Sequence, residues 1–164
     1  MNQLDGGRDV ADRQRTARVL ARAAEAELAA AWEGWGEDRP TIEFLRGPEA
    51  GLVMVQGRTG GTGDRFNLGE ATVTRATVLA RDTETGETTG TAYVLGSNPG
   101  HAGLAATFDA LLGSSHRERV LAEVIEPLER AQHERDTRAD ARARSTVVDF
   151  FTVARENAGP DEDE

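Results

Sequence analysis

The amino-acid sequence predicts an α+β domain: an antiparallel sheet of about four strands, with helices packed on it and a C-terminal arm that binds a partner. Its 164 residues are enough to build one hydrophobic core. Apolar residues recur at helical spacing near both ends of the chain. Between these ends, segments rich in β-branched residues are separated by turn residues, which is typical of strands.

The first predicted element is an amphipathic helix from Asp12 to about Trp32, because Val19, Leu20 and Leu28 recur on one face of a stretch dense in helix formers. The segment GWGEDRP that follows ends this helix, since two glycines and a proline do not continue a helix. Residues 1–11 are predicted to be disordered.

The four strands are predicted as two hairpins. Residues 41–46 alternate polar and apolar positions and pair with residues 52–58 through the turn sequence GPEAG. Residues 71–81 are rich in β-branched side chains and pair with residues 88–96 through the turn sequence TETGE.

Two helices are predicted after the strands. The first covers His101 to Leu112, and the second runs from about His116 to Leu128, with Pro127 kinking or ending it. The segment from Glu129 to Arg144 favours helix but is strongly charged, so it is either a solvated helix or one that binds a partner.

The C-terminal region holds a compact apolar patch and then an acidic stretch. On a strand, the adjacent aromatics Phe150 and Phe151 would face opposite ways, which suits a segment buried on both sides. Two interpretations remain, a last strand of the core and a strand that contacts a partner. The candidate interface residues are Val148, Phe150 and Phe151. The predicted domain therefore covers residues 12–156, of which 129–156 form the interaction arm, and residues 157–164 form a disordered acidic tail.

Composition excludes several classes of function. The chain has no cysteine, so disulfides, thiolate zinc sites, iron-sulfur ligation and thiol catalysis are ruled out. The formal net charge is -10, which disfavours binding to nucleic acid. No apolar run approaches the length of a membrane span or resembles a signal peptide, so we expect a soluble, cytoplasmic protein. All 19 basic residues are Arg, which fits a GC-rich genome or, with the acidic excess, a high-salt cytoplasm.

The glycine-rich segment from Gly57 to Glu70 is the best candidate for a binding site. Clustered glycines allow backbone N–H groups to turn toward an anion, and the arginines at either end can hold phosphate oxygens. It is not a Walker A sequence, because no Lys follows and the next segment is predicted to be a strand. A loop that only links two hairpins explains the spacing equally well. The candidates for positioning phosphate or substrate are Arg58, Gly60, Gly61, Thr62, Gly63, Arg65 and His101.

No catalytic or metal-binding set can be assembled from the sequence. The three histidines are dispersed, and no Ser-His-Asp arrangement or nucleophile elbow is recognisable. His101, at a predicted helix start, is either a ligand donor or a residue that caps or packs the helix. Glu70 is expected to orient a nearby guanidinium, of Arg58, Arg65 or Arg75, by a salt bridge.

The motifs GLVMVQGRTGGTGDRFNLGEATVTRATV, GTAYVLG, HAGLAATFDALL and VDFFTVAR occur in this order. Together they resemble the G subunit (PhnG) family of the carbon-phosphorus lyase system for phosphonate use. The resemblance extends over about Trp32 to Arg155, and its most specific part is the GGTG-x-RF-x-LGEAT core.

This resemblance implies a core complex with the H, I and J subunits. In such systems the G, H and I subunits, with an ATP-binding-cassette-like L subunit, displace adenine from MgATP by a phosphonate and produce ribose 1-phosphonate 5-triphosphate. The J subunit, which uses an iron-sulfur cluster and S-adenosylmethionine, then cleaves the carbon-phosphorus bond. The nucleosidase chemistry is credited to the I subunit, so this chain is expected to be a non-catalytic, supporting subunit without a cofactor of its own.

Two other hypotheses stay open from the residues alone. One is an independent small enzyme that binds phosphate or a nucleotide with the glycine-rich segment. The other is a free-standing structural protein.

Overall fold

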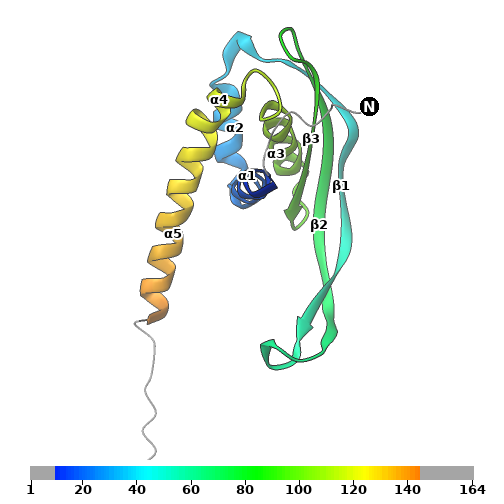
Figure 1. The fold of residues 1–164 in the computed structure, drawn as a ribbon, viewed down its shortest axis with the longest axis vertical. Coiled ribbons are helices and arrows are strands. Elements are labelled where there is room, and N and C mark those ends of the chain that lie inside the picture. The colour runs from blue at the N-terminus through cyan, green and yellow to red at the C-terminus, as the bar shows by residue number, and fades with distance from the viewer. Residues whose placement is uncertain (1–9, 145–164) are drawn as a thin grey trace, which may run out of the picture.

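The computed structural model describes residues 10–144, and these form an α+β fold, as the sequence predicts. In chain order the elements are α1 (Val10–Arg22), α2 (Glu25–Glu33), β1 (Thr41–Arg58), β2 (Arg65–Asp82), β3 (Gly86–Leu95), α3 (Pro99–Leu111), α4 (Arg117–Val120) and α5 (Glu126–Arg144). Short 3-10 turns cover Gly36–Asp38 and Thr59–Gly61, and a π-helical turn covers Leu121–Ile125. Figure 1 shows the sheet on one side of the body and the helices on the other.

The sheet is antiparallel and has three strands in the order β1-β2-β3, where the sequence suggested about four. Residues 41–46 do not pair with residues 52–58. Both belong to the continuous strand β1, which pairs along its length with β2, from Thr41 opposite Arg81 to Arg58 opposite Arg65. The segment GPEAG is absorbed as irregularities in register between Phe44 and Glu49 instead of reversing the chain.

The predicted glycine-rich loop is also shorter than expected. Residues from Arg65 onward already belong to β2, so only Thr59 to Asp64 connect the two strands. Polar and apolar side chains alternate after Arg65, and this period of two suits a strand in spite of Gly69. The second predicted hairpin is confirmed, because β2 and β3 pair from Val73 opposite Leu95 to Asp82 opposite Gly86.

The core lies between the upper half of the sheet and the helices. Helix α3 lies against β2 and β3, and α1 contacts both α3 and β3. Helices α2 and α5 lie on the side away from the sheet (Figure 1). Alternate residues of β2 face this layer, and Ala76, Val78 and Ala80 are fully buried. Small residues let helix and sheet approach closely, most of all at Gly90, where an added Cβ would lie 2.1 Å from the carbonyl oxygen of Ala106.

The first helical stretch is broken, although the sequence predicts one helix from Asp12 to about Trp32. Helix α1 ends at Arg22, and α2 begins at Glu25 after Ala24 adopts an extended conformation with φ -77° and ψ 144°. The local sequence is rich in alanine and favours helix throughout, so packing decides the break: Leu20 and Leu28 are both buried in the core although they lie on different helices.

Of the two predicted effects of Pro127, ending the helix is wrong, because α5 continues through Pro127 to Arg144. The π-helical turn Leu121–Ile125 lies immediately before α5, whose second residue is Pro127. The additional residue in this turn shifts the hydrogen-bonding pattern at the point where proline lacks an N–H group. Helix α5 then covers the charged segment up to Arg144, and the remainder of the predicted arm, residues 145–156, lies outside the described residues.

Candidate functional site

The glycine-rich segment forms the tip of the long β1–β2 hairpin, at the end of the sheet farthest from the helices (Figure 1). The turn from Thr59 to Asp64 closes through a hydrogen bond from Thr59 N to the carbonyl oxygen of Asp64, at 3.2 Å. Thr62 and Gly63 both donate their N–H groups to the carbonyl oxygen of Thr59, the latter at 2.8 Å. These two donors therefore hold the turn together and point inward.

Three glycines of the tip are needed for its backbone. Gly60 and Gly61 have positive φ angles of 58° and 82°, which side chains disfavour. Gly63 has no room for a Cβ, which would lie 2.6 Å from the carbonyl oxygen of Thr59. The glycine cluster is thus explained by the shape of a tight hairpin turn.

The structure brings together Arg58, Gly60, Gly61, Thr62, Gly63 and Arg65, all of which the sequence singled out. Arg58 and Arg65 lie directly opposite each other where the strands meet the turn. The Arg58 guanidinium donates to the carbonyl oxygen of Gly63 at 3.2 Å, so it also braces the turn. Arg65 is exposed and makes no ion pair within residues 10–144, so its guanidinium is available to a ligand or a partner.

The seventh predicted site residue, His101, lies elsewhere. It is in the first turn of α3, is 7% exposed, and its Nε2 is 2.8 Å from the carbonyl oxygen of Leu20 in α1. The side chain therefore joins two helices of the core, so of the two interpretations of His101, ligand donor or packing residue, the structure supports packing. Of the three arginines predicted as salt-bridge partners of Glu70, Arg75 pairs instead with Glu49 on the neighbouring strand, at 2.7 Å.

The predicted interface residues Val148, Phe150 and Phe151 lie outside the described residues.

Ser115, His116 and Asp82 lie together but are not arranged as a catalytic triad. Ser115 and Thr85 donate their hydroxyl groups to the Asp82 carboxylate, while the His116 Nε2 is 3.9 Å from it. These hydrogen bonds, that of Ser115 first, hold the pKa of Asp82 well below its usual range. The serine hydroxyl thus donates to the aspartate and not to the histidine, so the cluster ties the β2–β3 turn to the segment before α4.

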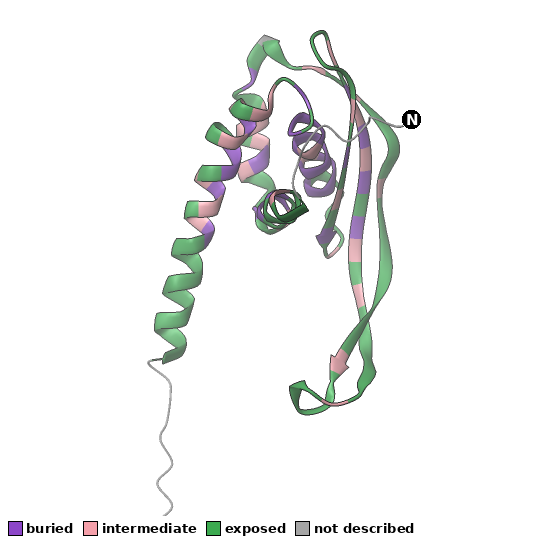
Figure 2. Ribbon diagram, in the orientation of Figure 1, coloured by how far each residue is buried: buried purple, intermediate pink, exposed green. Residues whose placement is uncertain are grey.

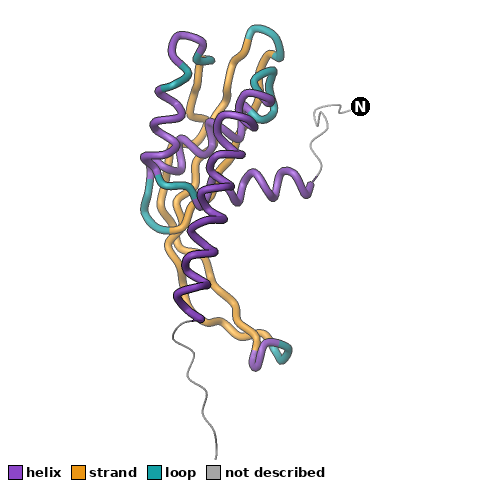
Figure 3. Tube along the Cα trace, turned by 90° about the vertical axis from the view of Figure 1, so that its left-hand side faces the viewer, coloured by secondary structure: helices purple, strands orange, loops and turns teal. Residues whose placement is uncertain are grey.

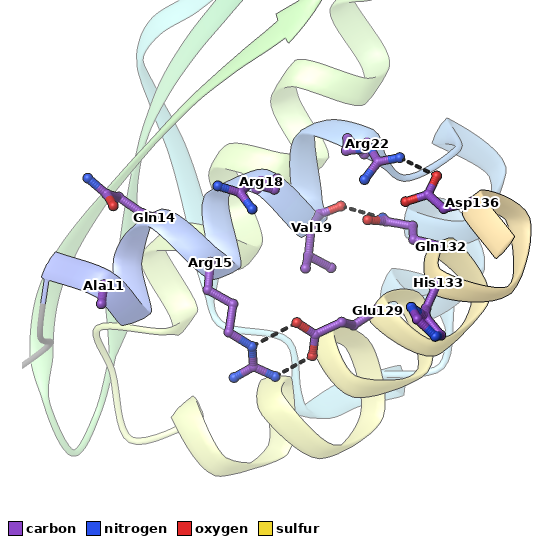
Figure 4. Close-up of a pocket in the computed structure, with 10 residues that line it drawn as sticks. All are labelled: Ala11, Gln14, Arg15, Arg18, Val19, Arg22, Glu129, Gln132, His133 and Asp136. Carbon is purple, nitrogen blue, oxygen red and sulfur yellow. Dashed lines mark hydrogen bonds and ion pairs between the residues drawn. The ribbon is translucent and has the colours of Figure 1, made fainter. Parts of the chain in front are cut away.

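A polar cleft of about 420 Å³ lies between α1 and α5 (Figure 4). Arg15 holds Glu129 through two hydrogen bonds, and Arg22 pairs with Asp136 at 2.7 Å. The hydrogen bonds from these arginines lower the pKa of both carboxylates. Because the buried Gln132 also donates to the carbonyl oxygen of Val19 at 2.8 Å, the cleft is the seam that fixes α5 to α1.

The surface feature that sequence reasoning missed is the apolar hairpin itself. Leu52 to Val55 are exposed, as are Phe66 and Leu68 on the facing strand (Figure 2). The signal in the sequence is four consecutive large apolar residues, LVMV, a run that is typical of strands covered on both faces.

Neither a metal site nor a membrane span is found in the part of the chain that the structure describes. Within residues 10–144, no three acidic or histidine side chains gather closely enough to hold a metal ion. None of the described helices combines the length and the apolar character needed to cross a bilayer.

The fold and its surface define a class: a small α+β domain that presents a long apolar hairpin, which is typical of proteins that work bound to others. Comparison with known proteins gives the family. The family model described as phosphonate metabolism protein PhnG matches residues 11–156. The chain is also 44% identical over 146 residues to the alpha-D-ribose 1-methylphosphonate 5-triphosphate synthase subunit PhnG of Rhizobium meliloti (strain 1021), covering 89% of this chain and 90% of that protein. The chain belongs to the PhnG family of phosphonate metabolism proteins, as the sequence motifs predicted.

Proposed function

We propose that this chain is a supporting subunit of an enzyme that displaces adenine from MgATP with a phosphonate, giving ribose 1-phosphonate 5-triphosphate. The observation that carries the proposal is the 44% identity, over nearly the whole chain, to a protein named as a subunit of an alpha-D-ribose 1-methylphosphonate 5-triphosphate synthase. The partners are the H, I and J subunits of the carbon-phosphorus lyase core complex. The chemistry belongs to these partners, including the iron-sulfur cluster and S-adenosylmethionine of a later step.

Within this assembly, the hairpin tip positions phosphate oxygens of the nucleotide or of the product. Support for this role comes from Arg65, whose exposed guanidinium has no ion pair in the described part of the chain, and from Arg58 directly opposite. Two N–H groups of the turn already donate to Thr59, so the arginines rather than the backbone would hold the anion.

An independent nucleotide-binding enzyme has less support. The glycines are accounted for by the turn, and His101 is buried away from it. Titration of MgATP into the isolated chain tests this alternative, because an independent enzyme binds the nucleotide without the other subunits.

The test of the proposed role is reconstitution with the H, I, J and L subunits and measurement of phosphonate-dependent adenine release. Omitting the chain should abolish the activity. Arg65→Ala should leave the complex intact but lower the activity roughly 10- to 100-fold, the size expected for one lost charge-assisted hydrogen bond. Arg13→Ala, which removes an exposed arginine from α1, is the matched control and should leave both unchanged.

Unchanged activity of Arg65→Ala in an intact complex would remove the tip from substrate positioning. Failure of the same variant to assemble would make Arg65 an assembly residue instead.

A further inference from the structure

The hairpin has a part that stands free of the body, here called the arm: Leu52–Arg58 of β1, Arg65–Thr72 of β2 and the turn between them. Strand β3 reaches only as far as Leu95, which lies opposite Val73. Apart from a hydrogen bond from Gly96 N to the carbonyl oxygen of Thr72, residues before Val73 therefore pair with β1 alone. Figure 1 shows the arm projecting below α1 and α3, in the direction in which α5 also extends, and the side view in Figure 3 shows its two strands curving beyond the upper sheet.

Both faces of the arm are apolar. The pairing register places Leu52 and Met54 on the face that continues the helix-covered side of the sheet, and Val53 and Val55 on the opposite face. On the helix side, Leu52 is 65% and Met54 53% exposed; on the opposite face, Val53 is 46% and Val55 38% exposed. Consecutive apolar residues of this kind are typical of strands that are covered on both faces.

The arm also holds most of the exposed apolar side chains of the described residues. Six of the eleven large ones belong to it: Leu52, Val53, Met54, Val55, Phe66 and Leu68. Two more, Tyr93 and Leu95, extend the patch at the base of the arm, next to Val73 and Arg75 in register. A two-stranded hairpin is only marginally stable in water, so the arm gains stability when something covers it.

The charges favour a different protein over a second copy of this chain as the cover. The arm itself carries two positive and two negative side chains, those of Arg58, Arg65, Asp64 and Glu70, whereas the whole chain has a net charge of -10. Pairing two arms would bring together two acidic chains, each with 21 acidic and 17 basic residues within residues 10–144, which electrostatic repulsion opposes. An apolar cleft in another protein can take up the neutral arm without this penalty. Strand β1 is also an edge strand of the sheet, so its free side can accept a strand from such a protein.

We propose that the arm inserts into an apolar cleft of a different subunit of the synthase and is covered there on both faces. This inference rests on the proposed function. It specifies the surface that joins this chain to the enzyme, and it explains how the Arg58–Arg65 tip would be carried to a site on another subunit.

The experiment uses the full chain and two nearly isosteric variants, one for each face. Val53→Thr places a hydroxyl group on the face of the arm opposite the helix side, and Met54→Gln places an amide on the helix-side face. Val10→Thr, at an exposed position of α1, is the matched control. The affinity of each chain for the purified H, I and J subunits is measured by biolayer interferometry, after circular dichroism confirms that each variant is folded.

Both arm variants should weaken binding about 10-fold or more, because each buries a polar group without a partner, and Val10→Thr should not. Weakening by only one arm variant would mean that one face stays open, and weakening by neither would mean that the arm is not in the interface; either result overturns the inference while leaving the proposed function intact. Sedimentation of the isolated chain as a dimer that Val53→Thr and Met54→Gln dissociate would make a second copy the occupant and also overturn it. If the unmodified chain does not bind these subunits at all, the proposed function itself fails.

Discussion

At the scale of single residues, Gly90 decides how closely the helical layer can approach the sheet. It lies opposite Val78 in the register of β2 and β3, beneath α3. A Cβ at this position would lie 2.1 Å from the carbonyl oxygen of Ala106 and 2.2 Å from the N atom of Ala110. Both are backbone atoms of α3, so no side-chain rotation can relieve the overlap. The missing side chain of Gly90 is what permits this packing.

Gly90→Ala should therefore destabilise the protein by about 1–3 kcal/mol, the usual cost of adding a methyl group to a close-packed site. Urea unfolding followed by circular dichroism measures the effect. Gly51→Ala is the matched control, because an added Cβ there meets nothing within 4 Å. Equal stability of the Gly90 and Gly51 variants would contradict the close approach of α3.

Asp82 provides a second test at this scale, because its carboxylate accepts hydrogen bonds from Ser115 and Thr85. Its pKa is lowered in the folded protein, so its contribution to the free energy of unfolding is complete above the unfolded-state pKa of about 4 and is lost as the pH falls below that value. Asp82→Asn should cost about 1–3 kcal/mol at pH 7. The difference from the unmodified protein should shrink as the pH falls from about 4.

Asp38→Asn is the control for this pH series. The Asp38 side chain is 83% exposed, and its Oδ2 forms a long surface ion pair of 3.8 Å with Nη1 of Arg119. Surface pairs of this kind contribute little. A stability difference for Asp82→Asn that stays constant between pH 7 and pH 3 would show that the carboxylate charge is not what holds the turn.

At the scale of elements, the break between α1 and α2 is set by packing and lacks a helix cap of the usual kind. Ala24 occupies the N-cap position of α2 but has no side-chain oxygen to accept a hydrogen bond from the first turn. Glu27 already reaches back to the N–H group of Ala24, at 2.8 Å, which is half of a capping box.

Ala24→Ser should complete this box and stabilise the protein by about 0.5–1.5 kcal/mol. The melting temperature followed by circular dichroism should rise. Ala30→Ser, the same substitution inside α2 at an exposed position, should lower it slightly because serine is a weaker helix former than alanine. If both substitutions lower the melting temperature, Ala24 is not acting as an N-cap.

At the scale of the whole molecule, the excess of acidic residues lies outside the arm, whose net charge is zero. The helical body and upper sheet hold most of the 29 acidic residues and compensate part of them with exposed pairs such as Arg22–Asp136 and Arg81–Glu43. Such pairs contribute little individually. Residues 10–144 contain 21 acidic and 17 basic residues, so a net negative charge remains as repulsion within this part of the chain.

We therefore expect the melting temperature to rise between dilute buffer and about 1 M NaCl, where the Debye length shrinks to roughly 3 Å. This result is also expected of a protein adapted to high salt. A melting temperature that does not depend on salt would contradict both the repulsion and that adaptation, and would leave genome composition as the reason for the absence of lysine.

The sequence by itself determined the fold class, the second hairpin and the family. Alternating β-branched residues made β2 and β3 recognisable, and the motif around Gly60 to Glu70 led to the PhnG family. It also grouped Arg58 and Arg65 correctly, because residues at the two ends of a tight turn are neighbours in any hairpin.

Only the tertiary structure decided which strands pair, where the first helix breaks and what His101 does. Strand β1 pairs with β2 and not with itself, because the core under α3 fixes which residues face inward, and the GPEAG segment alone carries no such information. The sequence leaves His101 as either a ligand donor or a packing residue, and the packing of α1, which places the carbonyl oxygen of Leu20 against it, decides for packing. The two-faced apolar arm follows from the same cause: β3 and α3 cover only the upper sheet, and local sequence does not record where neighbouring elements end.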